Sequence, residues 1–162
     1  MSSTATTRPP IGAAEKRSSR SAVLARAALL LVALAQADVG VWGLASPHGF
    51  FKGFPGLGRH WVVTLGTYNE HLVRDYAAAE LGLAVLLAGA AIFFARQLVL
   101  VAGAALLAAT LPHFAYHLTT TDSLSTGDNA ASLGGFVLEM VLVVVAMLVS
   151  WRLSERRPHV AS

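Results

Sequence analysis

The amino-acid sequence predicts an all-α membrane protein, a bundle of four transmembrane helices. Hydrophobic residues make up 55% of the chain and charged residues only 13%, whereas a soluble domain has about 25% charged residues. The mean hydropathy is +0.60. Four apolar segments each reach the roughly twenty residues that a helix needs to cross a hydrocarbon core about 30 Å thick.

The apolar segments define the domain organisation. Their approximate bounds are 24–45, 72–95, 97–118 and 130–151. We place the membrane domain at 21–153, between a disordered basic tail at 1–20 and a cytoplasmic tail at 154–162. The first segment is expected to remain as an anchor, because its apolar run exceeds the roughly 7–15 residues of a cleaved signal peptide.

The charge and the cysteine content exclude several classes of function. The formal net charge is +3 and the pI is near 9.8. The basic residues gather beside the apolar segments, which favours the lipid bilayer rather than nucleic acid as the partner. The chain has no cysteine, so disulfides, iron–sulfur clusters and thiol catalysis are excluded.

Lysine and arginine are distributed unequally between the two sides of the membrane. Nine of the twelve fall on the side of the termini and three on the other. Since cytoplasmic segments carry the excess of basic residues, both termini are predicted to be cytoplasmic. The nine are Arg8, Lys16, Arg17, Arg20, Arg26, Arg96, Arg152, Arg156 and Arg157, and the three are Lys52, Arg59 and Arg74.

The connections between the segments differ in length and composition. Residues 95–97 join the second and third segments so tightly that these two helices should form an antiparallel hairpin. Residues 46–70 form an outer loop rich in glycine, proline and aromatic residues. Its aromatic side chains suggest a loop that lies along the membrane interface. These side chains are Phe50, Phe51, Phe54 and Trp61.

Several residues are candidates for helix ends and helix contacts. Thr67 and Glu70 have the spacing of a capping box, which places the start of the second helix at about Tyr68. Asp128 or Thr126 is expected to cap the fourth helix. Glycines within the spans are expected to allow close helix packing. They are Gly82, Gly89, Gly103, Gly134 and Gly135.

Three carboxylates lie inside the apolar segments, and they are candidate catalytic residues. Asp38, Glu80 and Glu139 fall on three different helices. Counting about 1.5 Å per residue places all three near the bilayer midplane. An acidic group there costs about 2.5 kcal/mol or more, so it normally faces the bundle and finds partners. We therefore expect these acids to turn inward and form a site.

The histidines indicate a second polar group in the outer half of the bundle. His113 and His117 lie at i and i+4, on one helical face. His71 and Asp75 have the same spacing, with Arg74 beside them. Because the hairpin brings the outer ends of its two helices together, these five residues could form one cluster. Glu80, however, points about 180° away from His71, so one site with both residues would require distortion.

The same residues also have a structural interpretation. Arg74 and Asp75 could form an interfacial ion pair that fixes the depth of the second helix. Tyr116 and His117 could be ordinary residues of the aromatic belt at the headgroup level. Asp38 could hydrogen-bond to another helix.

A metal or haem site is one candidate chemistry. His71, His113 and His117, with carboxylates nearby, offer nitrogen and oxygen ligands for a transition metal. A haem held by His71 and a histidine of the third helix is also conceivable. A di-iron site is not expected, because the E-x-x-H pairs are absent. A two-haem cytochrome is excluded, because no histidine lies in the inner half of a helix.

Proton-coupled chemistry on a quinone or an isoprenoid is a second candidate. A carboxylic acid in hydrocarbon is most stable when protonated, so Glu80 or Glu139 could act as a general acid. Polar residues at the outer surface would hold the head of the substrate. These are His71, Arg74, Asp75 and Tyr116. A third candidate is a structural subunit of a membrane complex, or a homo-oligomer, in which the buried polar groups specify partner helices.

The layout resembles the small four-helix DoxX-like membrane proteins and related families common in actinobacteria. The resemblance covers most of residues 25–152. It includes a Gly/Pro loop after the first helix, an entry to the second helix with Asn69, Glu70 and Arg74, the tight hairpin, and a polar loop before the fourth helix. It implies a quinone-linked or redox-accessory role in a bacterial inner membrane.

Together, these observations favour a membrane protein that binds a lipophilic or metal cofactor in a redox-accessory role. A small membrane enzyme with a buried carboxylic acid and a structural subunit remain alternatives. The cofactor candidates are a transition metal, a haem and a quinone.

Overall fold

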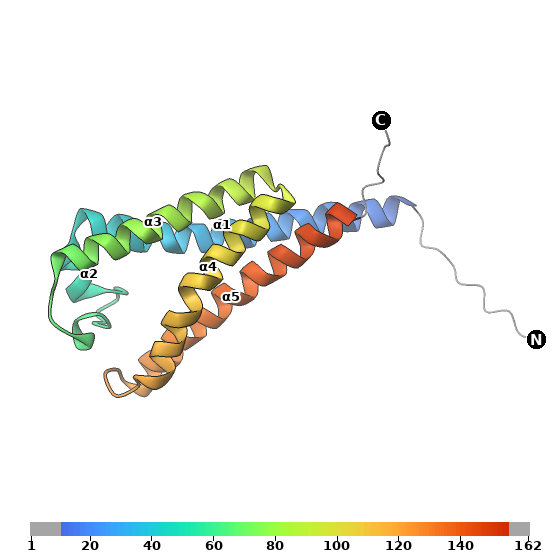
Figure 1. Cartoon of the computed structure of the whole chain (residues 1–162). Helices are drawn as coiled ribbons and strands as arrows, with labels where there is room; N and C mark the ends of the chain where they lie inside the picture. The colour runs from blue at the N-terminus through green and yellow to red at the C-terminus, as the bar shows by residue number, and fades with distance from the viewer. Residues whose placement is uncertain (1–10, 156–162) are drawn as a thin grey trace, which may run out of the picture.

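The computed structural model describes residues 11–155 of the chain, with side chains from residue 16 onward. The helices are α1 (Ile11–Ala45), α2 (Pro47–Gly53), the 3-10 helix η1 (Val63–Leu65), α3 (Glu70–Phe93), α4 (Arg96–Thr119) and α5 (Thr126–Glu155) (Figure 1). No strand occurs within 11–155, so the all-α prediction is confirmed. Four helices there are long and apolar enough to cross a membrane, which indicates a multi-pass membrane protein.

The beginning of α1 differs from the predicted boundary. Residues 11–20 were expected to belong to a disordered tail, but the helix already begins at Ile11. This stretch contains alanine, lysine and arginine, which have high helix propensity, and no glycine or proline after Gly12. Residues 154 and 155, predicted to begin the C-terminal tail, still belong to α5. The rest of the predicted tails, residues 1–10 and 156–162, lies outside the described residues.

The caps of α3 and α5 also differ from those expected. Asn69 caps α3, because its side chain accepts a hydrogen bond of 3.2 Å from the backbone N–H of Leu72. At the start of α5, the Ser125 hydroxyl accepts a hydrogen bond of 3.1 Å from the backbone N–H of Asp128. Asparagine and serine are both good caps, and each stands directly before the first helical residue.

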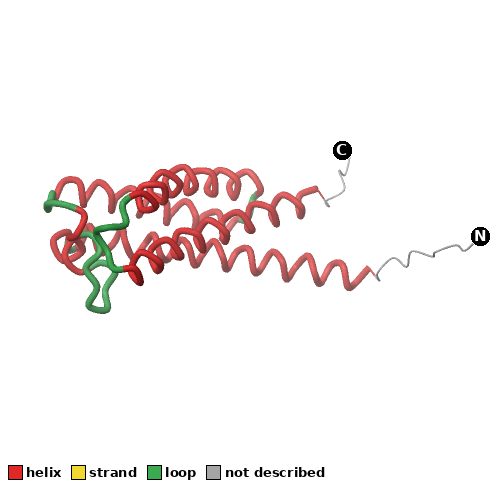
Figure 2. The backbone as a smooth tube through the Cα atoms, turned by 90° about the horizontal axis from the view of Figure 1, so that it is seen from below, coloured by secondary structure: helices red, strands yellow, loops and turns green. Residues whose placement is uncertain are grey.

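The long helices form a ring in which each one packs against two neighbours. α1 contacts α3 and α5, and α4 contacts the same two helices, so α1 and α4 are diagonally opposite, as are α3 and α5. Figure 2 shows that the longer connections gather at one end of the bundle, which we call the loop end. The first and last described residues lie at the other end, the termini end. In Figure 1, the pair of α4 and α5 diverges from the pair of α1 and α3 as the helices approach the loop end.

The closest helix contact, between α1 and α3, depends on glycine. A Cβ atom at Gly40 would lie 2.8 Å from the backbone N of Leu81 and 2.9 Å from the carbonyl O of Ala77. A Cβ atom at Gly43 would lie 2.6 Å from the Cβ of Ala77. Small residues let backbones approach, and the extra van der Waals contact stabilises helix pairs in lipid.

Of the glycines expected at helix contacts, Gly103 has that role. A Cβ atom at Gly103 would overlap the side chain of Met147, so it sets the approach of α4 to α5. The expectation is wrong for the other four, because a Cβ atom at each would meet no atom within 4 Å. These are Gly82, Gly89, Gly134 and Gly135.

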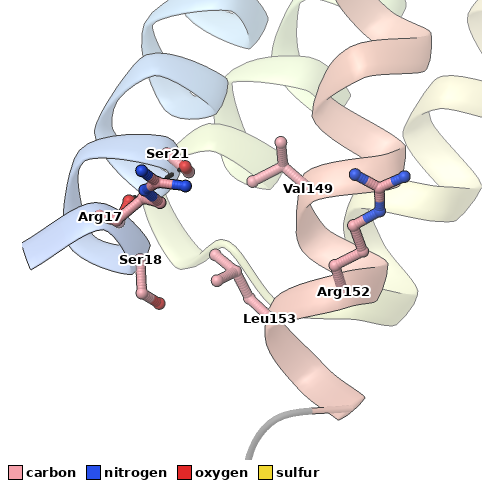
Figure 3. Close-up of a pocket in the computed structure, with 6 residues that line it drawn as sticks. All are labelled: Arg17, Ser18, Ser21, Val149, Arg152 and Leu153. Carbon is pink, nitrogen blue, oxygen red and sulfur yellow. Dashed lines mark hydrogen bonds between the residues drawn. The ribbon is translucent and has the colours of Figure 1, made fainter. Parts of the chain in front are cut away.

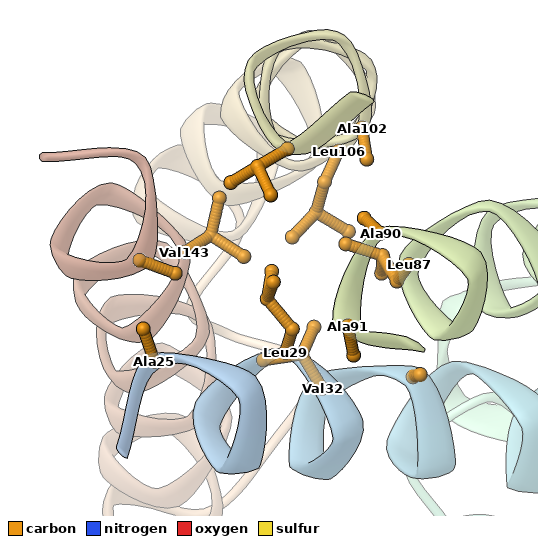
Figure 4. Packing of buried hydrophobic residues seen from close by; sticks show 12 residues of the cluster. Ala25, Leu29, Val32, Leu87, Ala90, Ala91, Ala102, Leu106 and Val143 are labelled. Atoms are coloured by element: carbon orange, nitrogen blue, oxygen red, sulfur yellow. The ribbon is translucent and has the colours of Figure 1, made fainter. Parts of the chain in front are cut away.

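The apolar core occupies the half of the bundle nearer the termini end. Its five largest fully buried side chains come from all four long helices, and Figure 4 shows the four that it labels pointing toward the space between the helices. Close packing and dispersion among these side chains stabilise this half. The five largest fully buried side chains are Leu29, Leu87, Leu106, Val99 and Val143.

A smaller aromatic core lies at the loop end. Phe50 of α2 packs with its ring centroid 5.8 Å from Trp42 of α1 and 4.9 Å from Phe54. Phe50 and Phe51 are only 3% and 8% exposed. Phe50 and Phe51 thus pack against α1 and α3 instead of pointing outward, and the expected position of the loop along the membrane interface stays a prediction.

A matched pair of substitutions tests the close approach of α1 and α3. We expect Gly40→Ala to lower the stability by about 1–3 kcal/mol, because the new methyl group overlaps backbone atoms that cannot move independently. Gly82→Ala adds the same methyl group where there is open space, and it should leave the stability unchanged. Thermal unfolding of both variants in mild detergent measures the difference. Equal melting temperatures would contradict the proposed role of Gly40.

Candidate functional site

Polar side chains from all four long helices meet between the middle of the bundle and the loop end. We call this set the polar cluster. Its members lie on α1, α3, α4 and α5, next to the apolar core but on its loop-end side. They are Gln36, Tyr76, Glu80, His113, His117 and Glu139.

A hydrogen bond from α1 to α5 begins the cluster. The Gln36 Nε2 amide donates to the Glu139 Oε1 carboxyl oxygen at 2.8 Å. Gln36 is buried and Glu139 is half-buried. Both side chains are therefore satisfied by a partner on another helix, as polar groups in a bilayer require.

Glu80 of α3 is the most deeply buried carboxyl group of the cluster. It is 8% exposed, and its Oε2 atom is buried without a hydrogen-bond partner in the protein. The Tyr76 hydroxyl lies beside it, one helical turn away, and Glu139 is near enough to interact with it electrostatically across the diagonal of the ring. Acidic groups at this depth of a membrane helix are costly, so they normally face the bundle and have a role there.

The histidines of α4 continue the cluster toward the loop end. The Nε2 atoms of His113 and His117 lie 3.2 Å apart. One nitrogen must donate and the other accept, so at least one imidazole is neutral. The ring of Phe136 on α5 lies 4.8 Å from His113 and 5.4 Å from His117, and Tyr76 meets His113 edge-on at 6.2 Å. These aromatic contacts fix both imidazoles on the inner side of α4.

His117 resembles Glu80 in carrying a polar atom without a partner. It is 7% exposed, and its Nδ1 atom has no hydrogen bond within the protein. An unsatisfied buried polar group costs about 1–3 kcal/mol. The cluster therefore contains two atoms, on α3 and α4, that gain stability from any group able to hydrogen-bond with them.

The structure brings together four of the residues that the sequence indicated. Glu80, Glu139, His113 and His117 belong to the polar cluster, which agrees with the expectation that buried acids turn inward. Asp38 does not. It lies two residues after Gln36, about 200° around the helix, and its side chain is exposed on the outer face of α1.

The outer residues of α3 form exposed pairs instead of joining the histidines of α4. The Nδ1 atom of His71 lies 3.3 Å from a carboxylate oxygen of Asp75, and both side chains are more than 60% exposed. Arg74 donates to Glu70 at 2.9 Å and to the backbone carbonyl of Leu44 at 2.9 Å. Arg74 thus pairs with Glu70 rather than with Asp75, and it binds the C-terminal end of α1.

The predicted metal ligands are divided between two places. His113 and His117 are together, but His71 is exposed and paired with Asp75. Within the part of the chain that the structure describes, no three His, Asp or Glu side chains are grouped as metal ligands. The arrangement does not fit a metal held by three protein ligands. Tyr116, a predicted cofactor-binding residue, is 48% exposed beside His117.

Sequence reasoning missed three residues of this region. Gln36 was overlooked in favour of Asp38, although it is also a polar residue within the first apolar segment. Tyr76 could have been found from its i,i+4 spacing to Glu80, which places both on one helical face. Phe136 carried no signal, because one phenylalanine in an apolar helix is indistinguishable from a core residue.

The loop between α2 and α3 connects the α1–α3 side of the loop end to α5. The connection between α2 and α3 reaches α5, where Arg59 forms an ion pair with Asp128. The Trp61 indole N–H donates to the same carboxylate at 2.9 Å. Asp128 therefore anchors the loop instead of capping its helix. This places residues 59–61 across the loop end, next to the side on which the polar cluster lies.

Comparison with known protein families, with curated proteins and with solved structures finds no match to this chain. The resemblance to DoxX-like proteins therefore stays a prediction.

A double-mutant cycle tests the hydrogen bond between Gln36 and Glu139. Each single leucine variant should be destabilised, because it leaves the other polar group buried without a partner. The double variant should recover part of the loss, with a coupling energy of about 0.5–2 kcal/mol in detergent unfolding. The cycle of Gln36→Leu with Asp38→Leu is the control, since these side chains point in opposite directions. Additive effects in the first cycle would exclude the contact.

Proposed function

We propose that the polar cluster binds the polar head of a lipophilic, proton-active molecule of the quinone class, and that the protein serves as a redox accessory in the membrane. The supporting observation is the convergence of polar side chains from all four spans, with protonatable groups on α3, α4 and α5. Two of these side chains, Glu80 and His117, have unpartnered buried atoms. Such groups inside a membrane are costly and are normally functional. A quinone head offers carbonyl oxygens for them and a flat ring for the adjacent aromatic side chains.

The roles of the residues follow from their positions. Protonated Glu80 would donate a hydrogen bond to a carbonyl oxygen, and His117 would bind through Nδ1. Phe136 and Tyr76 would lie against the ring, because aromatic groups stack favourably. Gln36 and Glu139 would hold the α1–α5 side of the site, and Glu139 would exchange protons with Glu80. A polyprenyl tail would lie in the surrounding lipid.

The alternative function, a small membrane enzyme, would use the same site. Glu80 would then be a general acid that protonates the bound molecule, as a buried carboxylic acid can do. Recovery of the ligand separates the two functions, because a binding protein returns it unchanged. For the location, we propose the bacterial inner membrane with both termini cytoplasmic, supported by the nine basic residues on that side.

Quinone binding tests the main proposal. A decyl-substituted benzoquinone should raise the melting temperature of the protein in detergent in a saturable way. Glu80→Gln and His117→Phe should each weaken the apparent affinity about tenfold, the loss of about 1.4 kcal/mol expected for a hydrogen bond to a charged or polar partner. Glu139→Gln should have a smaller effect, because glutamine still accepts from Gln36.

Matched controls distinguish a site from general partition into micelles. Asp38→Asn removes a carboxylate at a similar depth on the outside of α1, and His71→Gln removes an exposed imidazole. Both should bind the quinone as the wild type does. No stabilisation of the wild type, or an equal loss of affinity in cluster and control variants, would reject the proposal.

Asp38 favours a second candidate function, a subunit of a homo-oligomer or a membrane complex. An ionisable side chain on the outer face of a membrane helix costs about 2.5–3.5 kcal/mol in lipid, and a polar group on another helix would relieve this cost. We expect the wild type to exceed the 17.0 kDa of one chain in detergent-corrected light scattering, and Asp38→Asn to dissociate. Glu80→Gln, a buried change, should leave the mass unaltered. A monomeric wild type would contradict self-association.

A further inference from the structure

A cavity of about 270 Å³ lies between α1 and α5 at the termini end of the bundle (Figure 3). It is at the opposite end from the polar cluster, so the proposed quinone site does not account for it. Several water molecules of about 30 Å³ each would fit, and so would a phosphate group. The cavity is lined by Arg17, Ser18 and Ser21 of α1 and by Val149, Arg152 and Leu153 of α5.

The polar lining of this cavity suits an anion. Arg17 and Arg152 both line the cavity, one from each helix, and the Ser21 hydroxyl lies beside Arg17 (Figure 3). In this view the guanidinium group of Arg152 is turned away from Arg17. A guanidinium group presents a planar set of N–H donors that matches the oxygens of a phosphate. Two such groups on flexible side chains can close on one phosphate from both sides.

Two other arginines at this end, Arg26 and Arg96, are already engaged by groups of the protein. Arg26 donates to the carbonyl oxygens of Ala91 and Ile92 at 3.0 and 2.8 Å. Arg96 lies over the ring of Trp151, 3.7 Å from its centroid. The ion pairs among the described side chains, residues 16–155, engage neither Arg17 nor Arg152. Their charges are therefore available to an external anion.

The apolar lining and its surroundings distinguish a lipid from a free ion. Val149 and Leu153 form the α5 wall of the cavity. Exposed apolar side chains continue from it along both helices toward the middle of the bundle; they include Val23 at 62%, Leu24 at 70% and Leu148 at 52% exposure. A phospholipid joins a phosphate to acyl chains and so matches both parts of this surface, whereas a free phosphate matches only the arginines.

We propose that this cavity binds the headgroup of an anionic phospholipid, with the phosphate between Arg17 and Arg152 and the acyl chains along α1 and α5. Basic pockets between transmembrane helices bind anionic headgroups in this way. The lipid would link the first helix to the last at an end where the bundle has no connecting loop between them. It would thereby stabilise the contact of α1 with α5.

Native mass spectrometry of the intact protein with added phosphatidylglycerol or phosphatidylcholine tests this site. Phosphatidylglycerol should bind at least fivefold more tightly than phosphatidylcholine, as expected for about one favourable charge contact per arginine. The double variant Arg17→Gln/Arg152→Gln should lose about tenfold in affinity for phosphatidylglycerol. The matched double variant Lys16→Gln/Arg20→Gln removes two charges at the same end, outside the cavity, and should lose less than twofold.

Three results would overturn the proposal. One is the absence of a preference for phosphatidylglycerol in the wild type. Another is an equal loss in both double variants, since that would mean diffuse electrostatic attraction instead of a site. The third is displacement of the lipid by millimolar inorganic phosphate, which would assign the cavity to a free anion. If the double variant in the cavity does not fold, the two single variants should each lose about threefold, and no loss in either would also overturn it.

Discussion

The fold depends on one constraint, that hydrocarbon offers no hydrogen-bond partner to a buried polar group. Backbone groups meet it by forming helices, and side chains meet it by facing one another. The consequence is a bundle divided along its length. Toward the termini end, Leu29, Leu87, Leu106 and Val143 fill the space between the helices. Toward the loop end, the same space is filled by acids, histidines, an amide and a phenol.

This division also determines how the helices pack. Gly40 and Gly43 allow α1 and α3 to approach closely, and Gly103 does the same for α4 and α5. Each pair is thus held by its own small residues, and the two pairs are joined at one end by the apolar core. At the loop end, where Figure 1 shows the pairs diverging, the contacts between them are polar and loop-mediated. Because the ion pair of Arg59 with Asp128 is exposed, it contributes little stability, which leaves this end the easier one to open.

The sequence predicted the helices because they are encoded by local signals. Four apolar runs of sufficient length and a strong preference for helix in lipid leave few alternatives. It also predicted that Glu80 and Glu139 face inward, because the energy of a carboxyl group in lipid depends little on the details of the fold. The sequence could not predict which polar side chains pair with each other across the helices. Whether Gln36 or Asp38 faces the bundle depends on the rotation of α1, which is set by its glycine contacts with α3.

The same limit explains the outer histidines. Spacing placed His113 and His117 on one face, and it also placed His71 and Asp75 on one face. Only the crossing of α3 and α4 decides whether these two faces meet, and α3 turns His71 outward. The aromatic loop shows a related limit, since Phe50 and Phe51 have an apolar surface that fits an interface or a core equally well. Phe50 is buried against Trp42 and Phe51 against Tyr68, and neither contact follows from a local sequence pattern.

The unpartnered atoms of the polar cluster are the observation that supports the proposed binding site. Buried polar atoms without partners occur in three described side chains, Glu80, His117 and Ser150. A serine hydroxyl in a helix can turn to a carbonyl of the preceding turn, so Ser150 has a local remedy. Glu80 and His117 have no such local hydrogen bond, because one polar atom of each side chain stays without a partner. In a bundle selected only for stability, leucine and phenylalanine would fill these positions better. Natural proteins accept such losses mainly at functional sites, and here two of them lie in one cluster, on neighbouring helices.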